Sequence, residues 1–319
     1  MFAFLFALAS SSIKFLNEER SFLNWMRSNN QYFIGDEYNL RLGLFIARGR
    51  YIREFNKRPG NTFKVGFNKF SCYTPAEYQT LLGFRMDKKA YEKNTESKKY
   101  TVKEPDTLDW REKGVVNAIK DQGQCGSCWA FSAVCTCESA YAIKTGTLLS
   151  YSEQNLVDCV TLSFGCNGGN PSYAITYVTY IQSGQFNSEQ DYPYKAVGGT
   201  CSYDSSKAIG KVTSYHSVFF HSESDLLSKL VNYGPVSVAI DASQTSFNSY
   251  SGGIYQDSSC SSWFLDHAVA CVGYGSENGT NYWIVRNSWG TSWGEDGYFR
   301  LLRGENMCGI ASSALVAYV

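Results

Sequence analysis

The segment Gln122–Ser132, with the sequence QGQCGSCWAFS, decides the fold of this 319-residue chain. A glycine-bearing turn leads directly into a helix there. From Trp129 to about Lys144 apolar residues occur on every face of that helix, which indicates a buried helix. Cys128 then lies at the helix N-terminus, where unpaired backbone N–H groups and the helix dipole favour an anion. We therefore expect a lowered pKa for Cys128 and a nucleophilic thiolate, provided that a histidine reaches it.

Two later motifs supply the partners that such a nucleophile needs. Leu265–Val269 (LDHAV) contains His267, and Tyr282–Gly290 (YWIVRNSWG) contains Asn287. They follow the cysteine by about 130–150 residues or a little more. Together, the three motifs closely resemble those of papain-like cysteine proteases, the cathepsin L type in particular.

The resemblance covers nearly residues 18–319 and implies an α+β, papain-like fold of two lobes. A helical left lobe and an antiparallel, β-barrel-like right lobe would meet at a V-shaped cleft, with the cysteine on one wall and the histidine on the other. A helical inhibitory prosegment would precede them. The implied divisions are a signal peptide over 1–9, a prosegment over 10–103 and a mature peptidase over 104–319, with lobes at about 113–210 and 211–319.

Composition agrees with a globular protein of an oxidising compartment. The chain is 44% hydrophobic and 18% charged, with zero formal net charge and no basic run that would favour nucleic acid. Eleven cysteines favour oxidising surroundings.

Residues 1–9 are apolar and end in Ala7-Leu8-Ala9, which resembles a signal-peptidase site, although the run is short and no basic residue precedes it. A truncated signal, or an apolar contact for the next helix, is the alternative. No later apolar run reaches the ~18 residues of a membrane span, and we expect a lysosomal, acidic-vacuolar or secreted protein.

Helices are expected over Glu18–Asn29 and Asp36–Asn56. An ordinary amphipathic helix would explain the second, but its spacing also resembles the interrupted prosegment helix motif of cathepsin L-type zymogens, carried here by Glu37, Arg41, Phe45, Ile52 and Asn56. Arg48 stands where that family has asparagine.

The alternation over Thr62–Phe70 predicts a strand. Within it, Gly66, Asn68 and Phe70 resemble the second prosegment motif. Its closing position is Cys72 rather than aspartate, which puts a carboxylate pH trigger in doubt, and we expect Cys72 to be an unpaired, half-buried thiol. The polar, lysine-rich residues 85–104 have a linker composition, with the maturation cut expected between about Lys98 and Pro105.

In the mature part, Ser150 and Glu153 have capping-box spacing, and a helix is expected over Pro171–Gln182. Strands are expected beyond about residue 211, including Val236–Ile240 and Ala268–Gly273. Cysteine spacing cannot give connectivity, but the resemblance implies three bridges and a free Cys128. These bridges are Cys125–Cys166, Cys159–Cys201 and Cys260–Cys308. We expect Cys135, Cys137 and Cys271 to be small buried hydrophobes.

The resemblance also assigns the chemistry. Cys128 and His267 would form a thiolate–imidazolium pair that cleaves peptide bonds through a thioester acyl-enzyme. Asn287 would orient the imidazole, and Trp289 would shield that hydrogen bond. Gln122 and the backbone N–H of Cys128 would form the oxyanion hole. The two other histidines, His216 and His221, are expected to be structural.

Substrate contacts follow from the same resemblance. Gly168 and Gly169 would form the cleft edge and pair with a substrate strand, and Asp266 would have a local role in the cleft. The pocket for the second residue before the cut would be formed by Asn170, Pro171, Ala239, Leu265, Ala268 and, at its floor, Ser313. Without an acidic floor, it should prefer apolar or aromatic residues, although Asn170 departs from the family's bulky apolar residue. No long histidine-bearing insertion lies between Gly169 and Cys201, which favours an open cleft and an endopeptidase.

Other functions fit the sequence less well. A redox Cys125-x-x-Cys128 lacks a preceding βαβ pattern, a zinc site lacks a second ligand pair, and an inactive binding protein would normally have lost Cys128. We expect no metal or cofactor. The expected partners are protein and peptide substrates, the chain's own prosegment and cystatin-type inhibitors, and the expected state is a monomer. Asn278 begins an N-glycosylation sequon in a polar turn, although an unmodified turn fits equally well.

Overall fold

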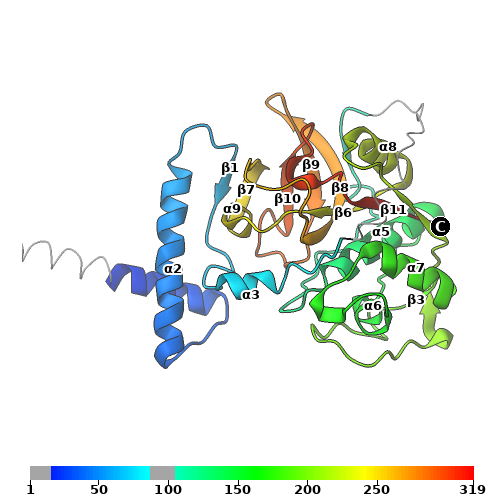
Figure 1. The fold of residues 1–319 in the computed structure, drawn as a ribbon, viewed down its shortest axis with the longest axis horizontal. Coiled ribbons are helices and arrows are strands. Elements are labelled where there is room, and N and C mark those ends of the chain that lie inside the picture. The colour runs from blue at the N-terminus through cyan, green and yellow to red at the C-terminus, as the bar shows by residue number, and fades with distance from the viewer. Residues whose placement is uncertain (1–15, 87–104) are drawn as a thin grey trace, which may run out of the picture.

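The computed structural model describes residues 16–86 and 105–319. The predicted signal peptide and most of the predicted linker lie outside these ranges. Figure 1 shows the prosegment helices at one end of the molecule, the large sheet in the middle and the helices α5, α6 and α7 at the other end. No helix of the described residues is long and apolar enough to cross a membrane.

The helical lobe is built around α5 (Cys128–Thr145), the helix expected from the opening motif. It packs against α6 (Glu153–Cys159) and α7 (Pro171–Ile181), and on its other side against strands of the large sheet. Burial on both sides explains why its sequence has no polar face. The helix ends at Gly146, whose positive φ of 75° closes the last turn with a hydrogen bond from its N–H to Ala142 O. Short elements complete the lobe: η1 (Gly165–Asn167), β3 (Phe186–Asn187), η2 (Ser205–Lys207) and β4 (Ala208–Ile209).

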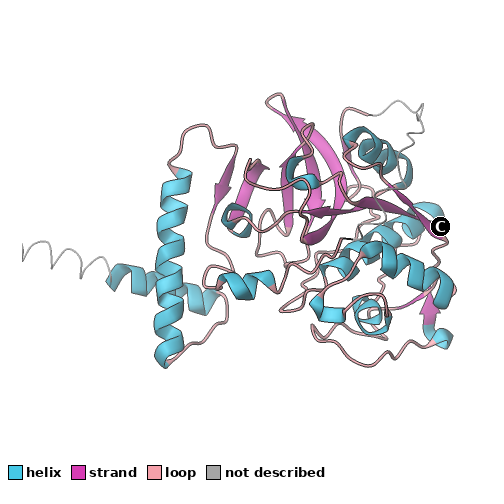
Figure 2. Ribbon diagram, viewed as in Figure 1, coloured by secondary structure: helices cyan, strands magenta, loops and turns pink. Residues whose placement is uncertain are grey.

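The second lobe is one large sheet, drawn in magenta in Figure 2. Its strands run in the order β1-β7-β10-β9-β8-β6-β11-β5, and β2 pairs with β8. The strands are β1 (Phe63–Val65), β2 (Leu108–Asp109), β5 (Ser214–Ser217), β6 (Val236–Ile240), β7 (Tyr250–Tyr255), β8 (His267–Glu277), β9 (Thr280–Arg286), β10 (Tyr298–Leu302) and β11 (Ala314–Tyr318). The predicted α+β class is confirmed, and the sheet of the lobe predicted to be antiparallel and barrel-like does not close into a barrel. The path is open, and β10 pairs with β7 in parallel.

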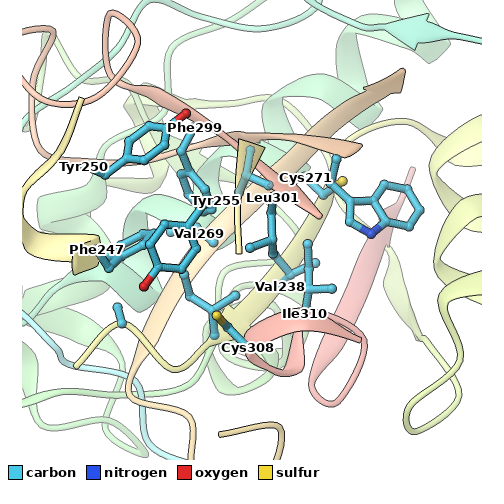
Figure 3. Close-up of a cluster of buried hydrophobic side chains, with 14 of the residues drawn as sticks. Val238, Phe247, Tyr250, Tyr255, Val269, Cys271, Phe299, Leu301, Cys308 and Ile310 are labelled. Carbon is cyan, nitrogen blue, oxygen red and sulfur yellow. The ribbon is translucent and has the colours of Figure 1, made fainter. Parts of the chain in front are cut away.

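This lobe also contains helices that the sequence analysis did not predict: α8 (Glu223–Tyr233), α9 (Thr245–Asn248) and the short η3 (Met307–Gly309). Its core is aromatic. Figure 3 shows the rings of Phe247, Tyr250, Tyr255 and Phe299 gathered beside Val269 of β8. The packing holds β8, the strand that begins at His267, in a fixed position.

The prosegment has its own small core, formed by a helix over residues 16–28 and α2 (Gly35–Asn56), which cross in Figure 1. The core residues are Phe22, Trp25, Met26, Leu42, Phe45 and Cys72. Cys72 is only 1% exposed, so the expectation of a half-buried thiol is wrong. The strand β1 adds the predicted prosegment to the edge of the large sheet through β7, and α3 (Pro75–Gln79) follows it.

Most predicted helices are confirmed, and the corrections are local. The strand expected over Thr62–Phe70 shrinks to Phe63–Val65, because Asn68 turns the chain by accepting a hydrogen bond from the N–H of Phe70 (2.9 Å). The cap of α6 is Ser152 rather than Ser150, since the Ser152 hydroxyl accepts from the Asn155 N–H at 2.9 Å.

Three disulfides join Cys125 to Cys166, Cys159 to Cys201 and Cys260 to Cys308. The first ties the turn before α5 to η1, on the same lobe. Because Cys125 is bonded to Cys166, it forms no redox pair with Cys128. The five remaining cysteines are free and buried: Cys72, Cys128, Cys135, Cys137 and Cys271.

Candidate active site

Cys128 is the first residue of α5 and is fully buried. The backbone N–H of Ala268 points at its sulfur, with an N···S distance of 3.4 Å. Ala268 follows His267 at the start of β8, so this contact joins the helical lobe to the sheet lobe. The structure thus brings Cys128 beside the residue that follows His267, although the cysteine and that histidine lie 139 positions apart in the sequence.

His267 is held by a hydrogen bond between its Nε2 and Asn287 Oδ1, 2.8 Å long. The N–H of Ser288 also donates to that oxygen at 2.8 Å, which fixes the amide. The indole of Trp289 stacks on the imidazole at 4.6 Å between ring centres. Because Asn287 Oδ1 can only accept, Nε2 carries a proton, and Nδ1, which has no partner among the described residues, is left to exchange a proton.

The prosegment covers this pair. Gly83, Phe84 and Arg85 run between the two lobes: the N–H of Phe84 donates to Asp266 O (2.9 Å), and the N–H of Gly169 donates to Gly83 O (2.8 Å). The N–H of Arg85 then donates to Gly169 O at 2.8 Å. Both walls of the cleft therefore pair with the backbone of one inhibitory segment, which occupies the edge expected to bind substrate.

Gly83 passes so close to the helix entrance that no side chain fits. A Cβ on it would lie 1.9 Å from the carbonyl oxygen of Gly126. Since such an approach is open only to glycine, the local sequence Gly83-Phe84 allows the backbone to reach Cys128.

Burial under the prosegment reverses the expected ionisation. It raises the pKa of Cys128 to about 12, outweighing the backbone N–H groups that favour the thiolate, and lowers the pKa of His267 to about 4. The expectation of a lowered cysteine pKa is wrong for this covered state. The pair is a neutral thiol and a neutral imidazole at neutral pH.

Phe84 fills the mouth of the predicted substrate pocket. Its ring packs with Ala239, Leu265 and Ala268, and it is 6% exposed. Behind it lies a cavity of about 240 Å³, which Asn170, Pro171 and Ser313 also line. The structure therefore brings all six predicted wall and floor residues together, and none of the residues lining this cavity or packing with Phe84 is acidic.

Asn170 and Gln122 are in the site but engaged. Asn170 caps α7 by accepting from the N–H of Ser172 (2.9 Å), and its amide donates to Arg85 O (2.9 Å). Gln122 accepts from the hydroxyl of Ser288 at 2.7 Å, while its amide donates to Leu81 O at 2.9 Å. The expected oxyanion donor thus bonds a prosegment carbonyl.

The remaining predicted residues lie around or outside the site. Asp266 accepts from the N–H of Ala242 (2.8 Å), and burial raises its pKa to about 7. Gly168 follows η1 with a φ of 108°. Asn278 occupies the exposed β8–β9 turn, and His216 and His221 lie in aromatic clusters away from Cys128.

The prosegment motif residues build the scaffold that positions the inhibitory segment. Arg41 bonds Glu37 and, through two nitrogens, Glu77 of α3, which holds the pKa of Glu77 at about 2. Asn56 holds Val65 of β1 through both its amide atoms, and Phe70 meets the ring of Trp289 edge-on at 5.1 Å. Two other motif residues are packed in hydrophobic surroundings: Phe45 is buried, and Ile52 packs on the main core. The last two bond the backbone of the sheet lobe. The N–H of Gly66 donates to Ser249 O, and the side-chain amide of Asn68 donates to Asn248 O.

Sequence reasoning missed Glu77 and Phe84. Glu77 has a local signal, since Thr74-x-x-Glu77 is a capping box that forms in the structure. Phe84 has only a weak one, a glycine-aromatic pair just before the polar linker.

Comparison with known proteins gives a consistent result. The family model described as papain family cysteine protease matches residues 104–318, and that of the cathepsin propeptide inhibitor domain matches residues 22–78. Digestive cysteine proteinase 1 of Homarus americanus is 44% identical over 287 residues, covering 88% of each chain. Cysteine proteinase 5 of Dictyostelium discoideum is 40% identical, over 97% of this chain and 94% of that one. The solved digestive procathepsin L2 of Tenebrio molitor larval midgut superposes with a TM-score of 0.88 at 36% identity, covering 95% of this chain and all of that one.

Proposed function

This chain belongs to the papain family of cysteine proteases and carries the inhibitory prosegment of a zymogen, and we propose that Cys128 and His267 are its nucleophile and its acid–base residue. The observation that carries this proposal is the hydrogen bond of His267 Nε2 to Asn287 Oδ1, which leaves Nδ1 of His267 free to exchange a proton. The next residue on the same strand, Ala268, contacts Cys128 Sγ through its N–H. Asn287 acts as the positioning residue, and Trp289 keeps water from the hydrogen bond.

Removal of the prosegment lets water reach the pair, so the proton of Cys128 passes to Nδ1 of His267 and a thiolate–imidazolium pair forms. The sulfur bonds to the substrate carbonyl carbon, and His267 returns the proton to the leaving nitrogen as the C–N bond breaks. A water molecule then attacks the thioester and gives a proton to His267. The C–S bond breaks, and the carboxylic product leaves.

The oxyanion formed in each step needs preorganised donors. The Gln122 amide, which bonds Leu81 O in the zymogen, becomes available when the prosegment leaves. The N–H of Cys128 is the second donor, because the first N–H groups of a helix have no partner within it. One such donor lowers the barrier by about 3–4 kcal/mol.

The pocket behind Phe84 supports a preference for apolar or aromatic residues at the second position before the cut. The prosegment itself places a phenylalanine there, and no acidic residue lines the cavity to pair with an arginine. The segment Gly83–Arg85 passes between Gly169 and Asp266 along the cleft, which supports an endopeptidase that binds a continuous chain.

We further assign a prosegment to residues 10–103 and a mature enzyme to 104–319, with a helical lobe at about 113–210 and a sheet lobe at about 211–319. The relatives include digestive enzymes and cathepsins, which supports a lysosomal or secreted destination. Cystatin-type inhibitors, a monomeric state and a glycan at Asn278 belong to the same proposal.

The test is hydrolysis of a fluorogenic Phe-Arg peptide after acid incubation with a thiol reductant, comparing the parent chain with Cys128→Ser. Activity in the parent alone, accompanied by loss of about the first hundred residues, supports the assignment. Retained activity in Cys128→Ser overturns it.

A further inference from the structure

A second cavity, of about 300 Å³, lies at the junction of the prosegment and the catalytic domain, and Cys128 is not among the residues that line it. Side chains of α2 and of the segment through α3 form one side, and Ser243, Thr245 and Asn248 of the catalytic domain form the other. A ligand bound in this cavity would therefore touch both halves of the zymogen.

The charged group in this cavity is Arg48, the residue that stands where the resembled prosegment motif has asparagine. Its Nη1 donates to Ser249 Oγ at 2.9 Å. No ion pair of Arg48 occurs in the described part of the chain, and burial lowers its pKa because no carboxylate offsets the desolvation. Arg41, seven residues earlier on α2, shows the contrast, since two carboxylates hold its guanidinium.

The carboxylates around the cavity are engaged in other contacts, and among them Asp241 accepts from the hydroxyl of the cavity residue Ser243 at 2.7 Å. Glu77 lies on α3, which contributes Pro75, Tyr78 and Gln79 to the cavity, but its carboxylate bonds Arg41 and Thr74. Asp257 accepts from the hydroxyls of Ser246 and Ser259. No aspartate or glutamate is among the described residues that line the cavity, so Arg48 is the one charged side chain of its lining.

The cavity wall offers further donors. Ser71 Oγ accepts from the N–H of Asn68 at 2.8 Å, and its own O–H donates to nothing in the described ranges. Thr245, at the start of α9, presents a second hydroxyl. A guanidinium with unused N–H groups, flanked by hydroxyl donors, matches the oxygens of a small oxyanion.

We propose that this cavity binds a small tetrahedral oxyanion of the sulfate or phosphate type between Arg48 and the catalytic domain. Because the anion contacts both halves, it stabilises the docked prosegment and slows its release. The site exists only in the zymogen, so anion binding and prosegment release oppose each other by mass action.

The experiment uses the full-length zymogen with Cys128→Ala, which prevents self-cleavage, and inorganic sulfate as the probe. The midpoint of thermal unfolding is measured against sulfate concentration, with chloride holding the ionic strength constant. We expect a rise of about 3 °C at ten times the dissociation constant, and above that constant the midpoint should increase with the logarithm of the sulfate concentration. Arg48→Gln should abolish this logarithmic part, whereas Arg50→Gln, which removes an exposed arginine from the same helix, should keep it.

Sulfate also stabilises proteins without binding to a site, and the comparison of the two variants separates the effects. A second readout is the rate of prosegment loss from the zymogen with Cys128 intact, which should fall about tenfold at ten times the dissociation constant. An identical sulfate response in Arg48→Gln and the parent, or a response in the parent that is linear in sulfate concentration throughout with no logarithmic part, would overturn the proposal.

Discussion

Phe84 is one of the contacts that keep the zymogen closed, and truncation of its ring should expose the proposed nucleophile. The ring is 6% exposed and packs on Ala239, Leu265 and Ala268. Truncating a buried phenylalanine costs about 3–5 kcal/mol in a protein core. Water can enter the cavity of about 240 Å³ beside the ring, so we take the low end, about 3 kcal/mol, for Phe84→Ala. That value corresponds to roughly a hundredfold rise in the fraction of open zymogen.

The assay is alkylation of Cys128 by iodoacetamide at neutral pH, followed by peptide mass spectrometry so that the other free cysteines are distinguished. Since the covered thiol is fully buried, alkylation follows the open fraction, and we expect it to accelerate about a hundredfold in Phe84→Ala. Tyr32→Ala is the matched control, because Tyr32 is a prosegment aromatic that is 82% exposed. An alkylation rate within twofold of the parent, or the same acceleration in Tyr32→Ala, would refute the reasoning.

Two further predictions concern the prosegment clamp and the pocket. Glu77→Gln should lower the free energy of unfolding of the Cys128→Ala zymogen by at most about 1 kcal/mol near pH 6. The pKa of Glu77 is depressed to about 2. The contribution of its carboxylate to stability is therefore complete above about pH 4.5 and is lost as the pH falls towards 2. Denaturant titrations at several pH values check this, and a difference that grows in acid would contradict it. Ser313 lies at the cavity wall. Ser313→Glu should raise kcat/KM for peptides with arginine at the second position before the cut by at least tenfold relative to peptides with phenylalanine there, since a charged hydrogen bond contributes about 1.5–3 kcal/mol. An unchanged ratio in a peptide panel would show that the residue 313 side chain does not reach the substrate's second position.

Local signals in the sequence predicted the elements that carry the site. The uninterrupted apolar run after Cys128 predicted α5, and Pro171 predicted the start of α7. The start of α8 also has a local signal, although the sequence analysis predicted no helix there. Ser222 is followed three residues later by Asp225, and the Asp225 N–H donates to the Ser222 hydroxyl. The strand order of the large sheet was harder to predict from local signals. The parallel pairing of β10 with β7, for example, depends on contacts between residues that are distant in the sequence.

The ionisation of the pair could not be read from the motifs around Cys128 and His267. A helix N-terminus favours a thiolate only if water or a charged partner stabilises it, and here Gly83 and Phe84 remove the water. Those residues lie about 45 positions before Cys128, in a stretch whose only sequence feature is a glycine beside an aromatic residue. Prediction of the resting state therefore required the path of the prosegment.

The same ionisation limits how acid could open the zymogen. When the prosegment leaves, a proton moves from Cys128 to His267, but at neutral pH the pair holds one proton before and after. By linkage, a step that binds no net proton does not depend on pH. Titration of Asp266 would oppose opening in acid, because burial raises its pKa to about 7. If removal of the prosegment lowers that pKa, the covered state binds more protons near pH 5–7 than the open state, so acid favours the covered state. Glu77, with its depressed pKa, has the right sign but responds only below about pH 4.5. Since Cys72 also replaces the carboxylate at the end of the second prosegment motif, titration of these groups does not favour opening of this zymogen at mildly acidic pH.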